Sequence, residues 1–109
     1  MITVTGYEVS SVMLSNYLSN LVNQFFKILP IRESEEPSLK EYMCSLQLEL
    51  LGCKELIIEL KNDSMYLSLI AILQYLIDED CDIPTVKREV FKAISICKKL
   101  SKKYFGEGA

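Results

Sequence analysis

The chain has 109 residues, of which half are hydrophobic and a quarter are charged, with four glycines and three prolines. This composition is typical of a folded helical domain and excludes an intrinsically disordered chain. The length predicts one helical domain over 1–109, with residues 1–8 as a flexible or partner-pairing arm. The chain has no histidine and its four cysteines form no C-x-x-C pair, which argues against a structural zinc site.

The formal net charge of -3 conceals an uneven distribution. Residues 84–109 contain seven of the twelve basic residues and only two acidic ones, so we expect a surface with a basic and an acidic region. The N-terminus lacks the pattern of a signal peptide, and no apolar run reaches the roughly 18 residues that a membrane span requires. We therefore expect a cytoplasmic protein with reduced thiols.

The first residues, 1–6, alternate in the manner of a short β-strand, which we expect either to fray or to pair with another copy. Apolar residues then recur at three- and four-residue steps from about Val9 to Leu29, which predicts a helix that Pro30 ends. The opposite face carries a single charge, so it is either a solvated polar surface or a protein contact. This face consists of Ser15, Asn16, Ser19, Asn20, Asn23 and the single charged residue Lys27, with Phe26 at its edge. The candidate partner-binding residues are Asn16, Ser19, Asn20, Asn23 and Phe26.

Residues 31–37 are predicted to form an acidic loop. Ser38 and Glu41 then match a capping box, in which the serine hydroxyl accepts from the amide of Glu41 and the glutamate reaches back. A second helix is therefore expected to begin at Ser38. Gly52 either ends this helix or is tolerated inside it, and a short helical pattern continues to Lys61.

The stretch from Ser64 to Ile77 has no charged residue and is apolar almost all round, so it is interpreted as a central buried helix that the others pack on. The preceding Asn62 and Asp63 supply side chains suited to cap its N-terminus. Its least apolar stripe consists of Ser64, Ser68, Ala71 and Tyr75. The predicted fold is all-α, a compact bundle of four to five helices around this central helix.

An acidic loop, 78–82, precedes the last helix, which Pro84 opens. One face of that helix is predicted to be buried: Val86, Val90, Ala93, Ile94, Cys97, Leu100 and Tyr104. The segment from Asp78 to Glu89 resembles an EF-hand calcium loop at its first, third, fifth and twelfth positions, but Ile83 stands where the turn requires glycine. The acids are better explained by the dipole of the following helix, and no metal or cofactor is predicted.

The other face of the last helix is basic and includes Arg88, Lys92, Lys99, Lys102 and Lys103. Three interpretations remain open: salt-sensitive binding of nucleic acid, an ordinary solvated surface, or contact with an acidic partner such as the acidic loops of a second copy. The overall acidity of the chain disfavours nucleic acid. No histidine or activated nucleophile accompanies the acidic residues, so no catalytic residue is predicted.

Two segments carry a resemblance to known proteins. The run FFKILPI at 25–31, followed by an acidic loop and then YMCSLQLELLG at 42–52, resembles small helical accessory proteins of phages and prophages of AT-rich bacteria. This resemblance implies a non-enzymatic role in regulation, assembly or inhibition, and it assigns no binding residue. The sequence thus predicts a self-associating protein-interaction module that binds a partner protein, with nucleic-acid binding through the basic face as the alternative and with no membrane or small-molecule substrate.

Overall fold

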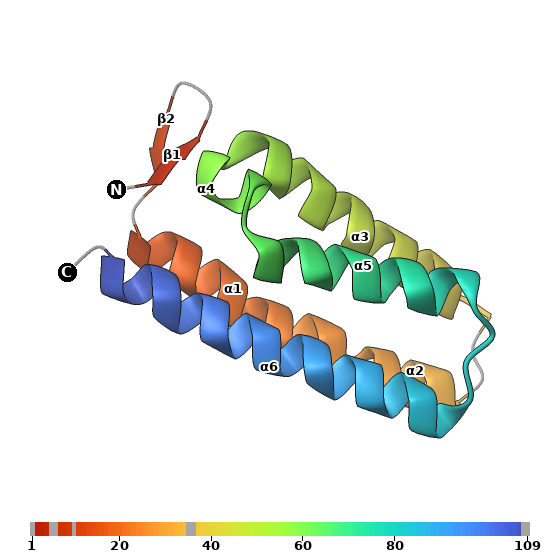
Figure 1. Ribbon diagram of the computed structural model, residues 1–109. Helices are drawn as coiled ribbons and strands as arrows, with labels where there is room; N and C mark the ends of the chain where they lie inside the picture. The colour runs from red at the N-terminus through yellow and green to blue at the C-terminus, as the bar shows by residue number, and fades with distance from the viewer. Residues whose placement is uncertain (1, 5–6, 10, 35–36, 108–109) are drawn as a thin grey trace.

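The computed structural model describes residues 2–4, 7–9, 11–34 and 37–107. Its helices are α1 (Ser11–Phe26), α2 (Ile28–Glu33), α3 (Leu39–Leu56), α4 (Ile58–Lys61), α5 (Ser64–Asp78) and α6 (Ile83–Glu107). The predicted all-α fold is confirmed (Figure 1). None of these helices combines the length and the apolar character that crossing a membrane requires.

The four longest of these helices form an elongated bundle of two layers, with extents of 42 × 22 × 19 Å. In one layer α1 and α6 run side by side in opposite directions, and in the other α3 lies beside α5 (Figure 1). Helix α5 also packs on α6, and the short α2 continues the line of α1. The two layers therefore enclose one apolar core between them.

Burial along α6 follows the predicted pattern. All seven residues expected to face the core are buried: Val86, Val90, Ala93, Ile94, Cys97, Leu100 and Tyr104. Helix α1 contributes Leu14, Leu18, Leu21 and Phe25 by the same three- and four-residue spacing. Ser15, predicted to lie on the outer face of α1, is buried instead, because its hydroxyl hydrogen-bonds the carbonyl and the hydroxyl of Ser101 in α6, each at 2.9 Å.

The apolar helix α5 does not occupy the centre that the sequence predicted for it. Five of its residues are buried, but Leu67, Ser68, Ala71 and Tyr75 are exposed. The helix belongs to the outer part of a two-layer bundle, so α3 and α6 cover only one side of it. The absence of charge on α5 therefore does not mean burial all round.

Three local expectations are also wrong. Pro30 does not end a helix: α1 ends at Phe26, Lys27 keeps a helical backbone conformation, and Pro30 lies in the first turn of α2, where a missing N–H costs nothing. The predicted acidic loop at 31–37 accordingly begins only at Ser34. Ser38 occupies the N-cap of α3, but its backbone is helical and its side chain makes no capping hydrogen bond, so the serine half of the predicted capping box is not formed. Of the two alternatives left open for Gly52, the structure selects the second: the residue lies inside α3, and no atom of another element lies within 4 Å of the position that a Cβ would take.

The predicted cap of α5 is present at Asp63, and it does more than cap. Its Oδ1 accepts hydrogen bonds from the amides of Met65 and Tyr66 at 2.9 and 3.2 Å. Its Oδ2 accepts from the Lys103 ammonium at 2.8 Å and from the Tyr104 hydroxyl at 2.7 Å. Asp63 is 7% exposed, so a buried carboxylate joins the start of α5 to the end of α6.

The N-terminal residues form two short strands in the backbone, β1 (Ile2–Val4) and β2 (Tyr7–Val9), paired antiparallel with Ile2 opposite Val9. The side chains of residues 1–12 lie outside the described part of the chain. The flexible or partner-pairing role of this arm therefore stays a prediction.

Candidate functional site

The predicted partner-binding face of α1, here the neutral face, is accessible along its whole length. Asn16, Ser19, Asn20, Asn23 and Phe26 are all exposed, and Phe26 is 50% exposed. These residues recur at three- and four-residue steps and so share one side of the helix. The buried Leu14, Leu18, Leu21 and Phe25 fix that orientation, because their burial turns the opposite side of α1 outward.

The structure adds an aromatic residue that the sequence interpretation did not assign. Phe91 of α6 is 47% exposed, and its ring meets the ring of Phe26 edge to face, with centroids 6.3 Å apart and planes at 74°. This is a favoured geometry for aromatic pairs. Phe26 and Phe91, the aromatic pair, therefore form one apolar unit on the surface where α1 and α6 lie side by side.

Two lysines share the side of α6 that carries Phe91. Lys98 and Lys102 follow Phe91 by seven and eleven residues. At 3.6 residues per turn, each of these lysines projects within about 20° of the direction of Phe91. In the described part of the chain no carboxylate lies within 4.0 Å of either ammonium group. The aromatic pair, the neutral face and these two lysines form a continuous surface over α1 and α6, which we name the docking face.

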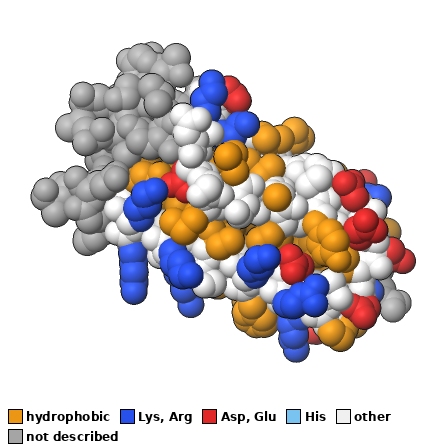
Figure 2. Space-filling model, viewed as in Figure 1, with side chains coloured by type: hydrophobic (Ala, Val, Ile, Leu, Met, Phe, Trp, Pro, Cys, Tyr) orange, Lys and Arg blue, Asp and Glu red, His pale blue; other side chains and the backbone are white. Residues whose placement is uncertain are grey.

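The predicted basic face of α6 is exposed, but its residues have different neighbours. Figure 2 shows its lysine and arginine side chains in a row along α6, with acidic side chains gathered at the end where α5 meets α6. Arg88 forms an ion pair with Glu89 at 3.2 Å, and Lys103 forms one with Asp63 at 2.8 Å. Lys92 lines a groove of about 260 Å³ between α5 and α6. Lys99 and Lys102 are exposed.

The acidic segment before α6 has structural partners of its own. Asp82 Oδ1 accepts from the amide of Thr85 at 3.0 Å, and hydrogen bonds from the side chain and backbone of Thr85 lower the pKa of Asp82. Asp78 Oδ1 accepts from the Gln74 side chain at 2.9 Å. Over the described residues no three His, Cys, Asp or Glu side chains converge as metal ligands. Asp82 thus caps the start of α6, where the sequence predicted acids that favour the helix dipole, whereas Asp78 belongs to the end of α5.

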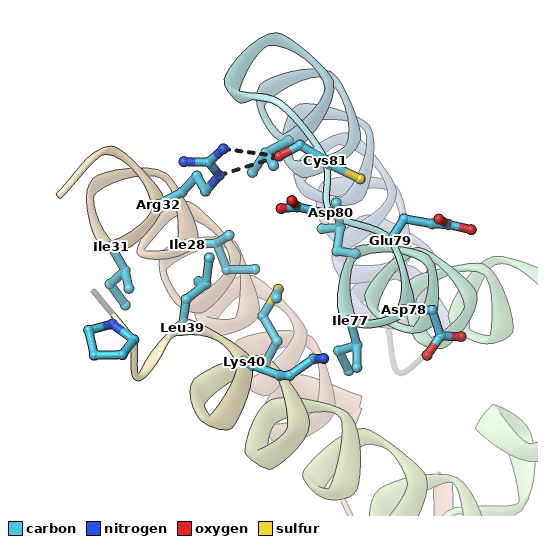
Figure 3. A pocket seen from close by; sticks show the side chains of 14 residues that line it. Ile28, Ile31, Arg32, Leu39, Lys40, Ile77, Asp78, Glu79, Asp80 and Cys81 are labelled. Atoms are coloured by element: carbon cyan, nitrogen blue, oxygen red, sulfur yellow. Dashed lines mark hydrogen bonds between the residues drawn. The ribbon is translucent and has the colours of Figure 1, made fainter. Parts of the chain in front are cut away.

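A pocket of about 400 Å³ lies at this same end of the bundle, between α2, the start of α3 and the loop from α5 to α6 (Figure 3). Its floor is apolar and includes Ile28 and Met43, while Arg32 and Lys40 face acidic residues across the rim. Arg32 donates from Nε and Nη2 to the carbonyl of Cys81 at 3.4 and 3.2 Å. This arginine, assigned to a loop by sequence, therefore ties α2 to the loop that precedes α6.

The described residues that line the pocket include one cysteine, Cys81, and three acidic residues. The chain has no histidine, and the four cysteines are free thiols, of which Cys97 is buried in the core, where burial raises its pKa to about 12. Carboxylates of both Asp78 and Asp80 lie at the rim of the pocket beside solvent. The described residues thus present an apolar pocket with a mixed-charge rim, the groove between α5 and α6, the basic face of α6 and the docking face. Comparison with protein families, with characterised proteins and with solved structures finds no significant match.

Proposed function

We propose that the chain is a small non-enzymatic protein-interaction module that binds another protein through the docking face. The single observation that carries this proposal is the aromatic pair. Two half-exposed phenylalanine rings contact each other on two helices that are otherwise amphipathic. Clusters of exposed aromatic residues within a polar surround are typical of binding surfaces.

The energetic argument rests on what surrounds the two rings. Burying the exposed half of each ring contributes on the order of 1 kcal/mol. The adjoining side chains Ser19 and Asn23 carry no charge, so a partner that covers them removes no ion from water. Such a surface gains free energy from its centre, and on the α1 side the exposed Lys27 is the charged residue that a partner must leave in water or pair.

The partner's chemistry follows from the α6 side of the same face. Lys98 and Lys102 lie within about 17 Å of Phe91 along the helix and have no described carboxylate in contact. A protein surface with an apolar centre and an acidic border complements them. The regulatory, assembly or inhibitory role implied by the phage resemblance agrees with such binding and stays part of the proposal.

The test compares which proteins are captured by wild type, by a variant of the docking face and by a control variant. Wild-type chain, the double variant Phe26→Ser/Phe91→Ser and the control Leu48→Ser are immobilised and exposed to extract of the source cells, followed by quantitative mass spectrometry. Leu48 of α3 is 68% exposed, more than either phenylalanine, and lies in the other layer. We expect an acidic protein to be captured by wild type and control and lost with the double variant. Equal capture by all three would refute the proposal.

Nucleic-acid binding is the second candidate function, and the row of basic side chains in Figure 2 favours it. Ion pairs with Glu89 and Asp63 engage Arg88 and Lys103, which leaves fewer basic groups to contact phosphate. Fluorescence anisotropy with labelled duplex and single strands at low salt tests this candidate. Affinity that falls with Lys92→Glu and Lys99→Glu and with added salt would support it. An anisotropy that does not change with the duplex or with the single strand would refute nucleic-acid binding.

A further inference from the structure

The pocket between α2, α3 and the loop from α5 to α6 shares no residue with the docking face. Four buried apolar residues line it, one each from α2, α3, α5 and α6: Ile28, Met43, Leu76 and Val86. Its volume of about 400 Å³ lies near the lower end of the range of about 300–1,000 Å³ that ligand pockets occupy. The pocket is therefore of a size for a small molecule with an apolar part.

Lys40 supplies a positive charge at the mouth of this pocket. It is the second residue of α3, and Figure 3 shows its side chain extending toward Ile77 of α5. Over the described residues no carboxylate lies within 4.0 Å of its ammonium group. Arg32 adds a second positive charge, but its Nε and Nη2 already donate to the carbonyl of Cys81. Lys40 is therefore the cation that can pair with an incoming anion without losing a contact.

Asp80 supplies the opposite charge from the loop after α5. Figure 3 shows its carboxylate directed across the pocket toward α2, whereas the side chains of Asp78 and Glu79 point away. Asp78 also accepts a hydrogen bond from Gln74 at 2.9 Å. The carboxylate of Asp80 forms no hydrogen bond or ion pair with the part of the chain that the structure describes. One cation and one anion, each without a partner there, thus face the same apolar pocket.

From this arrangement we infer that the pocket binds a small zwitterion with an apolar side chain, an amino acid or a dipeptide. The carboxylate of the ligand accepts from Lys40, and its ammonium group donates to Asp80. Its side chain covers the apolar residues of the pocket. Each charge of such a ligand meets an opposite charge, and hydrogen bonds between ionised groups are among the stronger ones.

Ligands of other charge fit this pocket less well. A simple anion would come close to Asp80, and a simple cation would come close to Arg32 and Lys40, so each would be opposed by a like charge. An internal peptide segment of a partner protein has no charged end to pair with Lys40 or Asp80. The two opposite charges therefore favour a ligand that carries both a free amino group and a free carboxylate.

An NMR titration of the isotope-labelled full chain tests the inference with L-leucine and L-leucyl-L-leucine. We expect saturable changes in the amide signals of Lys40, Ile77 and Asp80, and constant signals for Leu48 at the outer side of α3. Glycine, which has no side chain to bury, should bind at least tenfold more weakly than leucine. N-acetyl-L-leucinamide, which keeps the side chain and lacks both charges, should also bind at least tenfold more weakly.

Four variants separate the two charges of the pocket from charge in general. Lys40→Met and Asp80→Asn should each weaken leucine binding by about tenfold. The controls Lys99→Met and Glu55→Gln remove exposed charges near the opposite ends of α6 and α3 and should leave the affinity unchanged. All four positions are exposed, so the far-UV circular dichroism spectra should equal that of wild type.

Three results would overturn the inference: no saturable change with leucine or the dipeptide at millimolar concentration, equal binding of N-acetyl-L-leucinamide, or an affinity that Lys40→Met and Asp80→Asn leave unchanged. Binding of leucine alone or of the dipeptide alone would support it and fix the size of the ligand. Because the pocket and the docking face have no residue in common, none of these results bears on the proposed function.

Discussion

Replacing Asp63 with alanine is expected to destabilise the fold strongly, since three kinds of contact end at this one carboxylate. Alanine removes the cap of the two amides at the start of α5, which costs about 1 kcal/mol. It also removes the acceptor of the buried Tyr104 hydroxyl, a hydrogen bond to a charged group that contributes about 1.5–3 kcal/mol. The Lys103 ion pair adds little, because its side chain is 45% exposed. The sum is a loss of about 3 kcal/mol.

Urea unfolding followed by far-UV circular dichroism measures this loss, with an unchanged slope showing that the folded state stays compact. Two control variants divide the effect. Asp63→Asn keeps one oxygen that can cap the two amides, but it places an NH2 donor where the Tyr104 hydroxyl needs an acceptor. It should therefore retain only the cap and cost about 1 kcal/mol less than Asp63→Ala. Lys103→Met should cost less than about 1 kcal/mol. A loss below about 1 kcal/mol for Asp63→Ala would show that Asp63 does not connect α5 to α6 in the way described.

Three further predictions follow from the same contacts. Burial raises the pKa of Asp63, but hydrogen bonds from Lys103 and Tyr104 lower it more, so the pKa lies below the ordinary value of 3.8. The ionised carboxylate therefore stabilises the fold fully above the unfolded pKa, and this contribution is lost as pH falls through the folded pKa. The free energy of unfolding, measured against pH, should decrease less below about pH 4 for Asp63→Asn than for wild type. Tyr66→Phe removes the 2.7 Å hydrogen bond from a fully buried hydroxyl to the Leu50 carbonyl. It should lower the free energy of unfolding in urea by about 1–3 kcal/mol, and no measurable change would contradict the burial of that carbonyl. Ser68→Leu should change stability by less than about 0.5 kcal/mol, since the Ser68 side chain is exposed on α5, and a loss above about 2 kcal/mol would indicate a closely packed neighbour there.

The amphipathic helices were the part of the fold most accessible from sequence. In α6 the apolar residues recur at helical spacing between lysines, so both the buried set from Val86 to Tyr104 and the exposed basic set are correctly predicted. Helix α5 shows the limit of this reasoning. A run without charges has no polar side to orient it, and only the packing of α3 and α6 decides that Leu67 and Tyr75 face solvent.

The candidate site was predictable only in part. The neutral face of α1 followed from its lack of charge, and all five of its assigned residues are exposed. Phe91 was missed because only the basic residues on the outer side of α6 were assigned, although an apolar residue among them was a usable signal. The contact of Phe91 with Phe26 spans 65 residues of sequence, as the link from Asp63 to Lys103 spans 40. No local pattern contains pairings of such separation.

The central claim is that the side of α1 and α6 around the aromatic pair binds protein, and we propose that the self-association predicted from the sequence uses the same side. A dilution series of amide NMR spectra tests it residue by residue. We predict that the signals that change with concentration come from Ser19, Asn23 and Phe26 in α1 and from Phe91 and Lys98 in α6, and that those of Leu48 in α3 stay constant. Concentration-dependent changes centred on α3, with the signals of Phe26 and Phe91 unchanged, would contradict the account.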